Sequence, residues 1–151
     1  MSDETEINFY SKRGNEYGFL SNFWPSPMVI DGKEYPTNEH YYQSQKAVKP
    51  EQVEWIRNSP TAFLAMKAGR SLRMEKGELQ IHWELMKLDV MLKGLREKFK
   101  QNPDLRARLL ATGDAVLHED SPTDMVWGKK GRDALGILLM QVRWELRGGK
   151  I

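Results

Sequence analysis

The sequence contains no cysteine, and this absence removes several classes of chemistry at once. A chain without thiols has no disulfide bonds, no thiolate nucleophile, no cysteine-ligated zinc and no iron–sulfur cluster. Long apolar runs are also missing, because none approaches the ~20 residues that cross a membrane. The acidic start MSDETEINFY lacks the basic and apolar regions of a signal peptide. We therefore expect a cytoplasmic protein that does not act at a membrane.

An excess of charge of one sign is missing as well. The 23 Lys and Arg residues nearly balance the 21 Asp and Glu residues, which leaves a formal charge of +2. This balance argues mildly against a protein that only follows nucleic-acid phosphates, since such proteins usually carry a strong basic surplus. A phosphate-bearing substrate needs only a local cluster of basic side chains, so the composition leaves that class open.

The chain does contain enough apolar material for one ordinary folded domain. It has 151 residues, of which 40% are hydrophobic, and five each of Trp, Tyr and Phe. These aromatic residues provide too much drive for burial to allow wholesale disorder. No internal repeat, low-complexity tract or linker divides the sequence. We therefore predict a single domain over residues 1–151.

Local patterns predict an α+β fold that is mostly helical, with a small antiparallel sheet packed on helices. Alternating residues predict strands at 7–10 and 115–119. Asp31-Gly32 is the preferred pair for a type I′ turn and predicts a hairpin over 27–35. Capping residues, prolines and helical periodicity predict helices from Thr37 to Val48, from Pro50, from Pro60 to about Gly69, over 78–101, from Pro103 to Gly113, and over 133–146.

The longest of these helices has apolar residues on two opposite faces. One stripe holds Leu85, Leu88, Leu92, Leu95 and Phe99, and the other holds Leu79, Trp83, Met86 and Val90. A helix with this pattern is expected to be buried between two layers. Trp55 and Trp144 lie in predicted helices with no polar constellation nearby, and we interpret both as packing residues.

The segment TNEHYYQSQK (37–46) holds the first candidate site. On a helix, Glu39, Tyr42, Gln43 and Lys46 share one face within a sector of about 100°. A carboxylate, a phenol, an amide and an ammonium then lie side by side. The segment is either a solvent-exposed face or a site, and the tyrosine favours the second. His40 has no second ligand at metal-binding spacing on its own face, so we interpret it as structural and predict no metal site.

Two loops rich in aromatic residues hold further candidates. The loop GFLSNFWP (18–25) is either tied down by buried aromatic side chains or borders a pocket for a base or ribose. In the loop HEDSPTDMVWGKKGRDALG (118–136), Asp124 precedes Trp127-Gly128 by three residues. Trp127 in this loop, like Trp83 in its helix, is either a core residue or an indole that stacks on a base.

The second loop also carries features of a phosphate site. Gly128 and Gly131 allow a backbone to approach a ligand closely. Lys129, Lys130 and Arg132 add positive charge before the last helix, whose free N–H groups favour anions. The spacing matches no P-loop or dinucleotide fingerprint, and ordinary surface charge is the alternative interpretation.

Taken together, four segments resemble the NADAR superfamily, the YbiA-like N-glycosidases. They are FLSNFWP, PTNEHYYQSQK, the W-E-x-x-K stretch at Trp83 that leads to KF at 98–99, and DMVWGKKGRDALGILLMQVR. The resemblance covers nearly the whole chain, from INFY to LLMQVRWEL. This chain departs from the family in having Asp133 where Asn is usual, and in a short glycine-rich stretch after Trp127. The resemblance implies a NADAR/YbiA-like fold.

The resemblance also implies cleavage of a ribosyl C1′–N bond without a cofactor. Two substrate classes are associated with the family: guanine that bears ADP-ribose on its amino group in nucleic acid, and phosphoribosylamino-pyrimidine intermediates of riboflavin synthesis. A chain without a fused riboflavin-synthesis domain favours the first. By position, the family's catalytic residues correspond to Glu39, Lys46 and Asp124. The resemblance implies Asn22, Phe23, Trp83 and Trp127 as substrate-binding residues, and we predict Ser21, Tyr42 and Gly128 beside them. Protein partners are left open.

The chemistry of such a reaction gives each residue a hypothetical role. Cleavage of a glycosidic bond builds positive charge on the sugar, which a carboxylate such as Glu39 stabilises. Asp124 would be the second acid or base, or would hold a ribose hydroxyl. Lys46 would keep Glu39 ionised or attack an opened ribose as a Schiff-base amine, and two tryptophans would sandwich the base. The alternatives without chemistry are a binder of ADP-ribose or a nucleotide, and a nucleic-acid-binding protein.

Overall fold

The structure is a computed structural model that describes residues 5–10 and 16–148. Within these residues the chain is mostly helical, with two small sheets, which confirms the predicted fold class. The helices are α1 (Asn38–Ser44), α2 (Pro50–Arg57), α3 (Ala62–Arg70), α4 (Trp83–Gln101), α5 (Pro103–Ala111) and α6 (Ala134–Leu146). The strands are β1 (Glu6–Phe9), β2 (Met28–Ile30), β3 (Lys33–Tyr35) and β4 (Val116–Glu119), and the 3-10 helices are η1 (Gly18–Leu20) and η2 (Met74–Lys76).

The chain forms two compact units. Residues 25–98 form one, which we call the central unit, and residues 1–24 with 99–151 form the other, the terminal unit. The single domain over 1–151 stays a prediction. No helix within the described ranges is long and apolar enough to cross a membrane.

The hairpin of the central unit follows its turn sequence. β2 and β3 pair antiparallel, and the turn residues Asp31 and Gly32 have φ angles of 52° and 80°. Positive φ at both positions defines the type I′ turn that the Asp-Gly pair predicts. The buried face of the hairpin packs with Tyr41 of α1, whose ring meets that of Tyr35 edge-on at 5.2 Å. The hairpin thereby covers one side of α1.

The start of α1 is fixed by its cap, as predicted. The Thr37 hydroxyl oxygen accepts the backbone N–H of His40 at 3.1 Å. The His40 ring lies between the same hydroxyl, 2.8 Å from Nδ1, and the Ser59 carbonyl oxygen, 2.9 Å from Nε2. A carbonyl only accepts, so Nε2 carries the hydrogen and Nδ1 accepts from Thr37. Burial lowers the pKa of His40, which agrees with a neutral, structural histidine.

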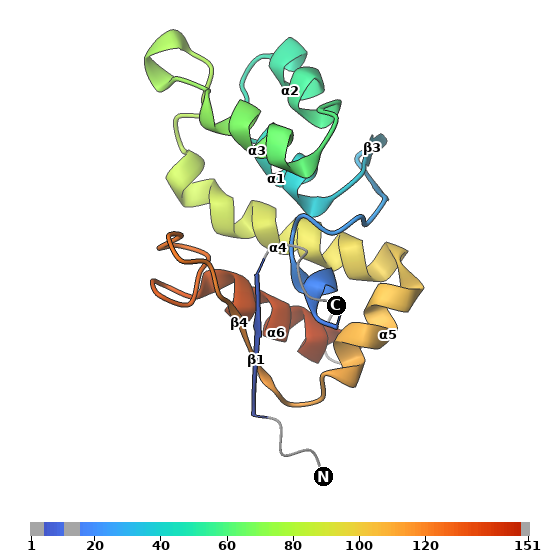
Figure 1. Ribbon diagram of the computed structural model, residues 1–151. Helices are drawn as coiled ribbons and strands as arrows, with labels where there is room; N and C mark the ends of the chain where they lie inside the picture. The colour runs from blue at the N-terminus through green and yellow to red at the C-terminus, as the bar shows by residue number, and fades with distance from the viewer. Residues whose placement is uncertain (1–4, 11–15, 149–151) are drawn as a thin grey trace. The chain divides into compact units, whose positions relative to one another are not determined.

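All seven residues of α1 are buried, because other helices approach it from several sides (Figure 1). At Gly69 of α3 a side chain would overlap the Gln43 amide, and at Gly94 of α4 it would overlap the Asn38 amide. Both helices therefore approach α1 more closely than any residue with a Cβ allows. The interpretation of 37–46 as a solvent-exposed face is wrong for α1.

The predicted end of α1 at Val48 is also wrong. The helix ends at Ser44, and Ala47 forms an antiparallel bridge with Leu79. Beside this bridge the Val48 N–H donates to the Glu78 carbonyl at 3.0 Å. Pairing with the segment before α4 requires extended backbone, which stops the helix. Lys46 consequently lies in a turn after α1.

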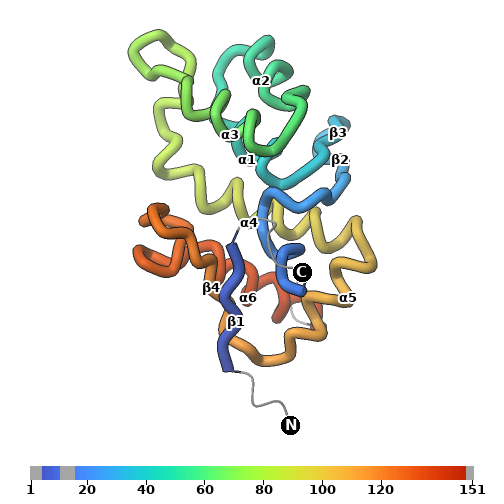
Figure 2. The backbone as a smooth tube through the Cα atoms, viewed as in Figure 1, coloured from blue at the N-terminus to red at the C-terminus, as the bar shows by residue number. Residues whose placement is uncertain are grey.

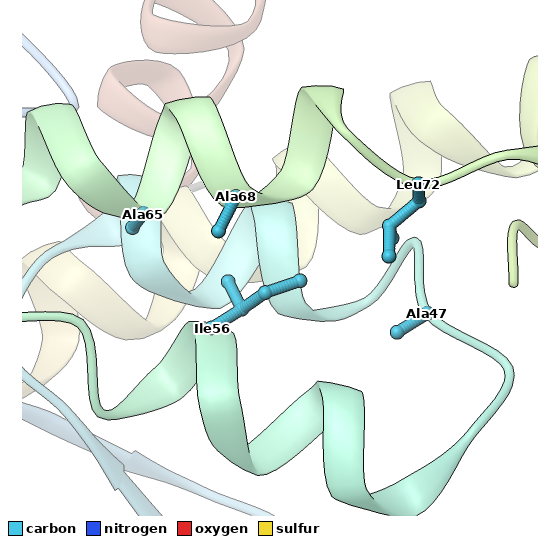
Figure 3. Close-up of a cluster of buried hydrophobic side chains, with 5 residues drawn as sticks. All are labelled: Ala47, Ile56, Ala65, Ala68 and Leu72. Carbon is cyan, nitrogen blue, oxygen red and sulfur yellow. The ribbon is translucent and has the colours of Figure 1, made fainter.

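α2 and α3 meet through a small apolar cluster (Figure 3). Ile56 points from α2 toward α3, where Ala65 and Ala68 face it, and Leu72 and Ala47 extend the cluster. The Thr61 side chain caps α3 by accepting the Leu64 N–H at 3.1 Å. Small side chains at this contact allow the two helices to pack closely.

The predicted start of α4 and two predictions about burial are wrong. α4 begins at Trp83 instead of residue 78, and Leu85 in its first half is 80% exposed. Trp83 at its first position and the second half, with Leu95 and Phe99, are buried in the predicted manner. Trp55 and Trp144, which we interpreted as packing residues, are each 55% exposed. Helical spacing gives the direction of a side chain but does not show whether another element covers it.

In the terminal unit, β1 and β4 lie side by side in parallel, with Ile7 opposite Leu117 (Figure 2). The predicted antiparallel arrangement therefore holds for β2 and β3 alone among the described strands. Strands so far apart in sequence need a long crossover, which allows parallel pairing. α6 packs on β4 at Gly136, where a side chain would overlap the Leu117 carbonyl.

The contact of Gly69 with Gln43 can be tested by adding one methyl group. Gly69→Ala should lower the free energy of unfolding by about 1–3 kcal/mol, the usual cost of overpacking. At an exposed helix position the same change would raise it by about 1 kcal/mol, so the sign is decisive. Urea unfolding measures the effect. The double variant Gly69→Ala, Gln43→Ala should recover part of the loss, and additive losses would contradict the assigned contact.

Candidate functional site

Four of the predicted site residues gather in the central unit. Glu39 and Tyr42 come from α1, Lys46 from the turn after it, and Trp83 from the start of α4. The buried rings of Tyr42 and Trp83 lie 5.2 Å apart at an angle of 60°. The Lys46 Nζ lies 5.6 Å from the Tyr42 ring centroid and 6.0 Å from that of Trp83, within cation–π range. We call the two rings the aromatic platform.

Glu39 is held by its own helix. Glu39 is only 7% exposed, and its Oε2 accepts the Gln43 Nε2–H at 2.8 Å. Gln43 in turn is held by the close approach of Gly69. Within the described residues, the Gln43 Oε1 is buried without a hydrogen-bond partner. The amide is thus fixed in the orientation that donates to the carboxylate.

Lys46 loses its proton more readily than an ordinary lysine. Burial lowers its pKa to about 8, and the charge of Glu39 opposes this shift by favouring the ammonium. The positive charges of Arg70 and Lys87 lower the pKa further, whereas Glu84 opposes them. At pH 7 the ammonium predominates, and one pH unit higher the two forms are equally populated. Lys46 therefore suits proton transfer near neutral pH.

Two cations near Lys46, Arg70 and Lys87, were not predicted from the sequence. Arg70 ends α3 directly after Gly69 and is exposed. Lys87 lies one helical turn after Trp83, and its Nζ is 2.5 Å from the Glu84 carboxylate. The spacing of Trp83 and Lys87 is a signal for a shared face that the W-E-x-x-K motif already contained. Arg70 had no such signal, because its place depends on how α3 packs on α1.

Lys98, the lysine of the KF pair at 98–99, is a further unusual lysine. Its side chain is fully buried, and burial lowers its pKa to about 7. Ionisable groups with strongly shifted pKa values are common at functional sites. Lys98 therefore joins the residues of interest in the central unit.

In the terminal unit, the loop with Ser21, Asn22 and Phe23 is tied down by aromatic contacts. Ser21 and Asn22 are buried, and the Ser21 Oγ accepts the Phe23 N–H at 3.0 Å. The Arg108 guanidinium lies 4.5 Å from the Phe19 ring centroid and 5.6 Å from that of Trp24. Each of these contacts fixes the loop backbone near the predicted substrate-binding residues.

Asp124 shapes the loop that presents Trp127. Its Oδ1 accepts the N–H groups of Val126 at 2.9 Å and Trp127 at 2.8 Å. The Ser121 Oγ accepts the Asp124 N–H at 3.0 Å. One carboxylate oxygen thus has a structural task, and the indole of Trp127 is half-buried.

The glycines of this loop pack closely against the loop itself, and their approach to a ligand stays a prediction. A side chain at Gly128 would lie 2.5 Å from the Asp124 carbonyl oxygen, and one at Gly131 would overlap the Met125 carbonyl. Their close approach is thus to the loop's own backbone. Of the predicted phosphate-binding cations, Lys129 donates to the Asn8 Oδ1 at 2.9 Å. These contacts explain the loop without a ligand.

Asp133, the departure from the family pattern, precedes α6 with a φ of 56°. Asp and Asn are the side chains that tolerate this left-handed region best. The Asp133 Oδ2 is hydrogen-bonded to the His118 Nδ1 of β4 at 2.6 Å. The carboxylate therefore joins α6 to β4 at the position where the family usually has an amide.

The described residues thus bring Glu39, Tyr42, Lys46 and Trp83 together in one unit. Asp124, Trp127, Gly128 and the 21–23 loop belong to the other unit, and their approach to the aromatic platform stays a prediction. Within residues 5–10 and 16–148, no three His, Asp or Glu side chains could jointly hold a metal ion.

Comparisons with known proteins show the family of this chain. The NADAR domain model matches residues 8–147. N-glycosidase YbiA of Escherichia coli (strain K12) is 43% identical over 150 residues, which cover 97% of this chain and 91% of that protein. N-glycosidase Npun_R5314 of Nostoc punctiforme is 39% identical, with 93% of this chain and 92% of that protein covered. Riboflavin biosynthesis protein VVA0006 of Vibrio vulnificus is 40% identical, with 95% of this chain and 39% of that protein covered.

The fold agrees as well. The NMR structure of the E. coli protein YbiA matches with a TM-score of 0.86 at 42% sequence identity, covering 99% of this chain and 89% of that one. The two proteins therefore share one fold over nearly the whole of this chain. The chain therefore belongs to the NADAR family, among its YbiA-like N-glycosidases.

Proposed function

We propose that this N-glycosidase removes ADP-ribose from the amino group of guanine in nucleic acid by hydrolysis of the C1′–N bond. One observation carries the proposal: the buried Glu39 carboxylate lies in the same group as Lys46, whose ammonium covers the aromatic platform. A carboxylate, a lysine of shifted pKa and two rings are the groups that this reaction requires.

Glu39 acts on the sugar. As the C1′–N bond breaks, positive charge develops at C1′ and is stabilised by an adjacent carboxylate. Water adds its hydroxyl to C1′, and its proton passes to Glu39 acting as general base. The hydrogen bond from Gln43 keeps the carboxylate in one orientation, which saves reorganisation during the reaction.

Lys46 acts on the leaving group. The departing amino nitrogen takes a proton, and an ammonium with a pKa of about 8 is matched in strength to that task near neutral pH. The ammonium is also the prevailing form at pH 7. Asp124 would serve as a second acid or hold a ribose hydroxyl through its other carboxylate oxygen, as the resemblance implies.

The remaining groups of the cluster line the substrate site. The platform of Tyr42 and Trp83 provides one aromatic wall for the base, and the resemblance implies Trp127 as the other. Stacking of one base on an aromatic side chain contributes about 1–3 kcal/mol. Arg70 and Lys87 add two further positive charges near Lys46. Lys87 is paired with Glu84, so the surplus of positive charge comes from Lys46 and Arg70. This charge suits the two phosphates of ADP-ribose better than the single phosphate of a phosphoribosyl group, which supports the modified guanine as substrate.

The second candidate substrate is a phosphoribosylamino-pyrimidine. The Vibrio vulnificus relative, 40% identical to this chain, is named a riboflavin biosynthesis protein, and this name favours the pyrimidine substrate. The bond broken and the roles of Glu39 and Lys46 are the same for both substrates. A binder of ADP-ribose without catalysis is the third candidate, since it needs the rings and cations but no carboxylate.

The substrate is tested by offering both compounds to the purified protein. We expect release of free ADP-ribose from an oligonucleotide with one modified guanine, at a kcat/KM at least about tenfold above that for the phosphoribosylamino-pyrimidine. Chromatography of base and sugar products measures both rates. Release from the pyrimidine alone would establish the second candidate. Calorimetric binding of ADP-ribose with release from neither compound would establish the binder.

The carboxylate is tested by Glu39→Gln. This change keeps the shape of the side chain and removes the charge, so turnover should fall by about 10² or more while the urea-unfolding midpoint stays close to that of the wild type. Glu75→Gln, which removes an exposed carboxylate of the same unit, is the control and should leave turnover unchanged. Wild-type turnover of the Glu39 variant would remove this residue from the mechanism.

The protonation state of Lys46 is tested by a pH profile. If the ammonium donates the proton, kcat/KM should fall as the pH rises through about 8, where the amine becomes neutral. Lys46→Arg keeps the positive charge at this pH, and its lower activity should lack the descending limb. A rate that instead rises through pH 8, with a borohydride-trapped sugar adduct on Lys46 by mass spectrometry, would assign the Schiff-base role.

A further inference from the structure

The outward side of α2 and α3 carries a groove of about 600 Å³ that the proposed reaction does not use. Trp55 and Ser59 line it from α2 and the turn after it, and Leu64 and Lys67 line it from α3. Trp55, Leu64 and the neighbouring Phe63 are all exposed. The groove lies wholly within the central unit.

The packing of the two helices explains why these large side chains point outward. The interior contact is made by Ile56, Ala65 and Ala68, which are small or well fitted (Figure 3). Trp55 adjoins Ile56 in α2, and Phe63 and Leu64 precede Ala65 in α3, so their side chains point away from the contact in other directions and are exposed. Exposed apolar residues gathered in one place indicate a binding surface.

The charge of this surface is positive. The sequence of α3, AFLAMKAGR, contains Lys67 and Arg70 and no acid. The Lys67 Nζ lies 5.5 Å from the Phe63 ring centroid. Glu54, the acid in the groove, is bound by Lys33 at 2.7 Å and by Arg57 at 2.5 Å. Glu51, one helical turn before Trp55, adds a second acid, and the four cations still exceed the two acids.

The surface also leads toward the aromatic platform within the same unit. Arg70 lies one helical turn beyond Lys67, and the intervening Gly69 touches Gln43, which holds Glu39. A chain that extends from the platform along the outside of α3 would therefore meet Arg70 first, then Lys67, and then the exposed rings.

We propose that the outward face of α2 and α3 binds the single-stranded nucleotides next to the modified base. Trp55 and Phe63 stack on bases, and Lys67 contacts a phosphate. Aromatic rings alternating with cations are the usual means of binding single strands without sequence preference. This inference rests on the proposed nucleic-acid substrate and extends it from one nucleotide to its neighbours.

The first experiment measures binding without catalysis. An unmodified single-stranded oligonucleotide of about ten nucleotides, a typical site size, is titrated with wild-type protein by fluorescence anisotropy. Trp55→Ala should weaken binding by about 5- to 150-fold, the range for loss of one base stack. Lys67→Glu should reduce the slope of log affinity against log salt by at least about 0.7, the value for one phosphate contact.

Two matched variants control for general effects. Trp144→Ala removes a tryptophan of α6 that is as exposed as Trp55, at 55%. Lys76→Glu reverses an exposed lysine of the same unit on η2. Neither variant should change oligonucleotide affinity. Equal losses in all four variants would reduce the effect to non-specific charge or instability and overturn the proposal.

The second experiment separates the flanking site from the catalytic site. With a modified guanosine mononucleoside as substrate, Trp55→Ala should keep wild-type kcat/KM, whereas with the modified oligonucleotide its KM should rise by the factor found in binding. Equal losses on both substrates would indicate a structural role and overturn the proposal. Binding that depends on Trp55 in a protein that releases no ADP-ribose would support the face while refuting the proposed reaction.

The third measurement addresses other occupants of the groove. Sedimentation of the wild type and Trp55→Ala gives the oligomeric state of each. The same state for both supports an open face that nucleic acid can occupy. A wild-type oligomer that dissociates in the variant would make the groove an interface between copies of this chain and overturn the proposal.

Discussion

The hydrogen bond from Gln43 to Glu39 is the interaction on which the candidate site depends. It is short-range and lies within one helix, yet it is set by tertiary packing, because Gly69 of α3 leaves room for the Gln43 amide in one place. Gly94 of α4 does the same for Asn38 at the start of α1. Two residues without side chains thus allow NEHYYQS, a segment that is polar except for its two tyrosines, to be buried as a helix. Burial of polar groups is tolerated when their partners are fixed in this way.

Burial gives this cluster its chemistry. A lysine in water keeps its proton far above neutral pH, and only removal of solvent lowers the pKa of Lys46 to about 8. The nearby carboxylate limits that shift, so the amine stays protonated at pH 7 while remaining able to give its proton away. The two rings exclude water from one side of the ammonium and supply a cation–π interaction in its place. Structure and reactivity therefore have the same cause.

Sequence patterns predicted the local features well, because these depend on neighbouring residues. The Thr37 cap, the Asp31-Gly32 turn and the prolines that open α2 and α5 follow from short-range chemistry. Features that depend on packing were predicted poorly. The pattern of 37–46 did not show whether this face meets solvent or forms a site. α1 ends earlier than predicted because Ala47 pairs with Leu79. The exposure of Trp55 and Leu85 was missed for the same reason, since periodicity does not reveal which helix face is covered.

α3 contributes both to the candidate site and to the exposed groove, because its two sides have different surroundings. Its inner side, at Ala65, Ala68 and Gly69, consists of small residues that let it pack against α1 and α2. Its outer side presents Phe63, Lys67 and Arg70. A helix with small residues inward fixes the Gln43 amide that holds the Glu39 carboxylate, without covering its own outer face. The close packing that buries Glu39 and the exposed outer surface of α3 are therefore consequences of one helix placed close to its neighbours.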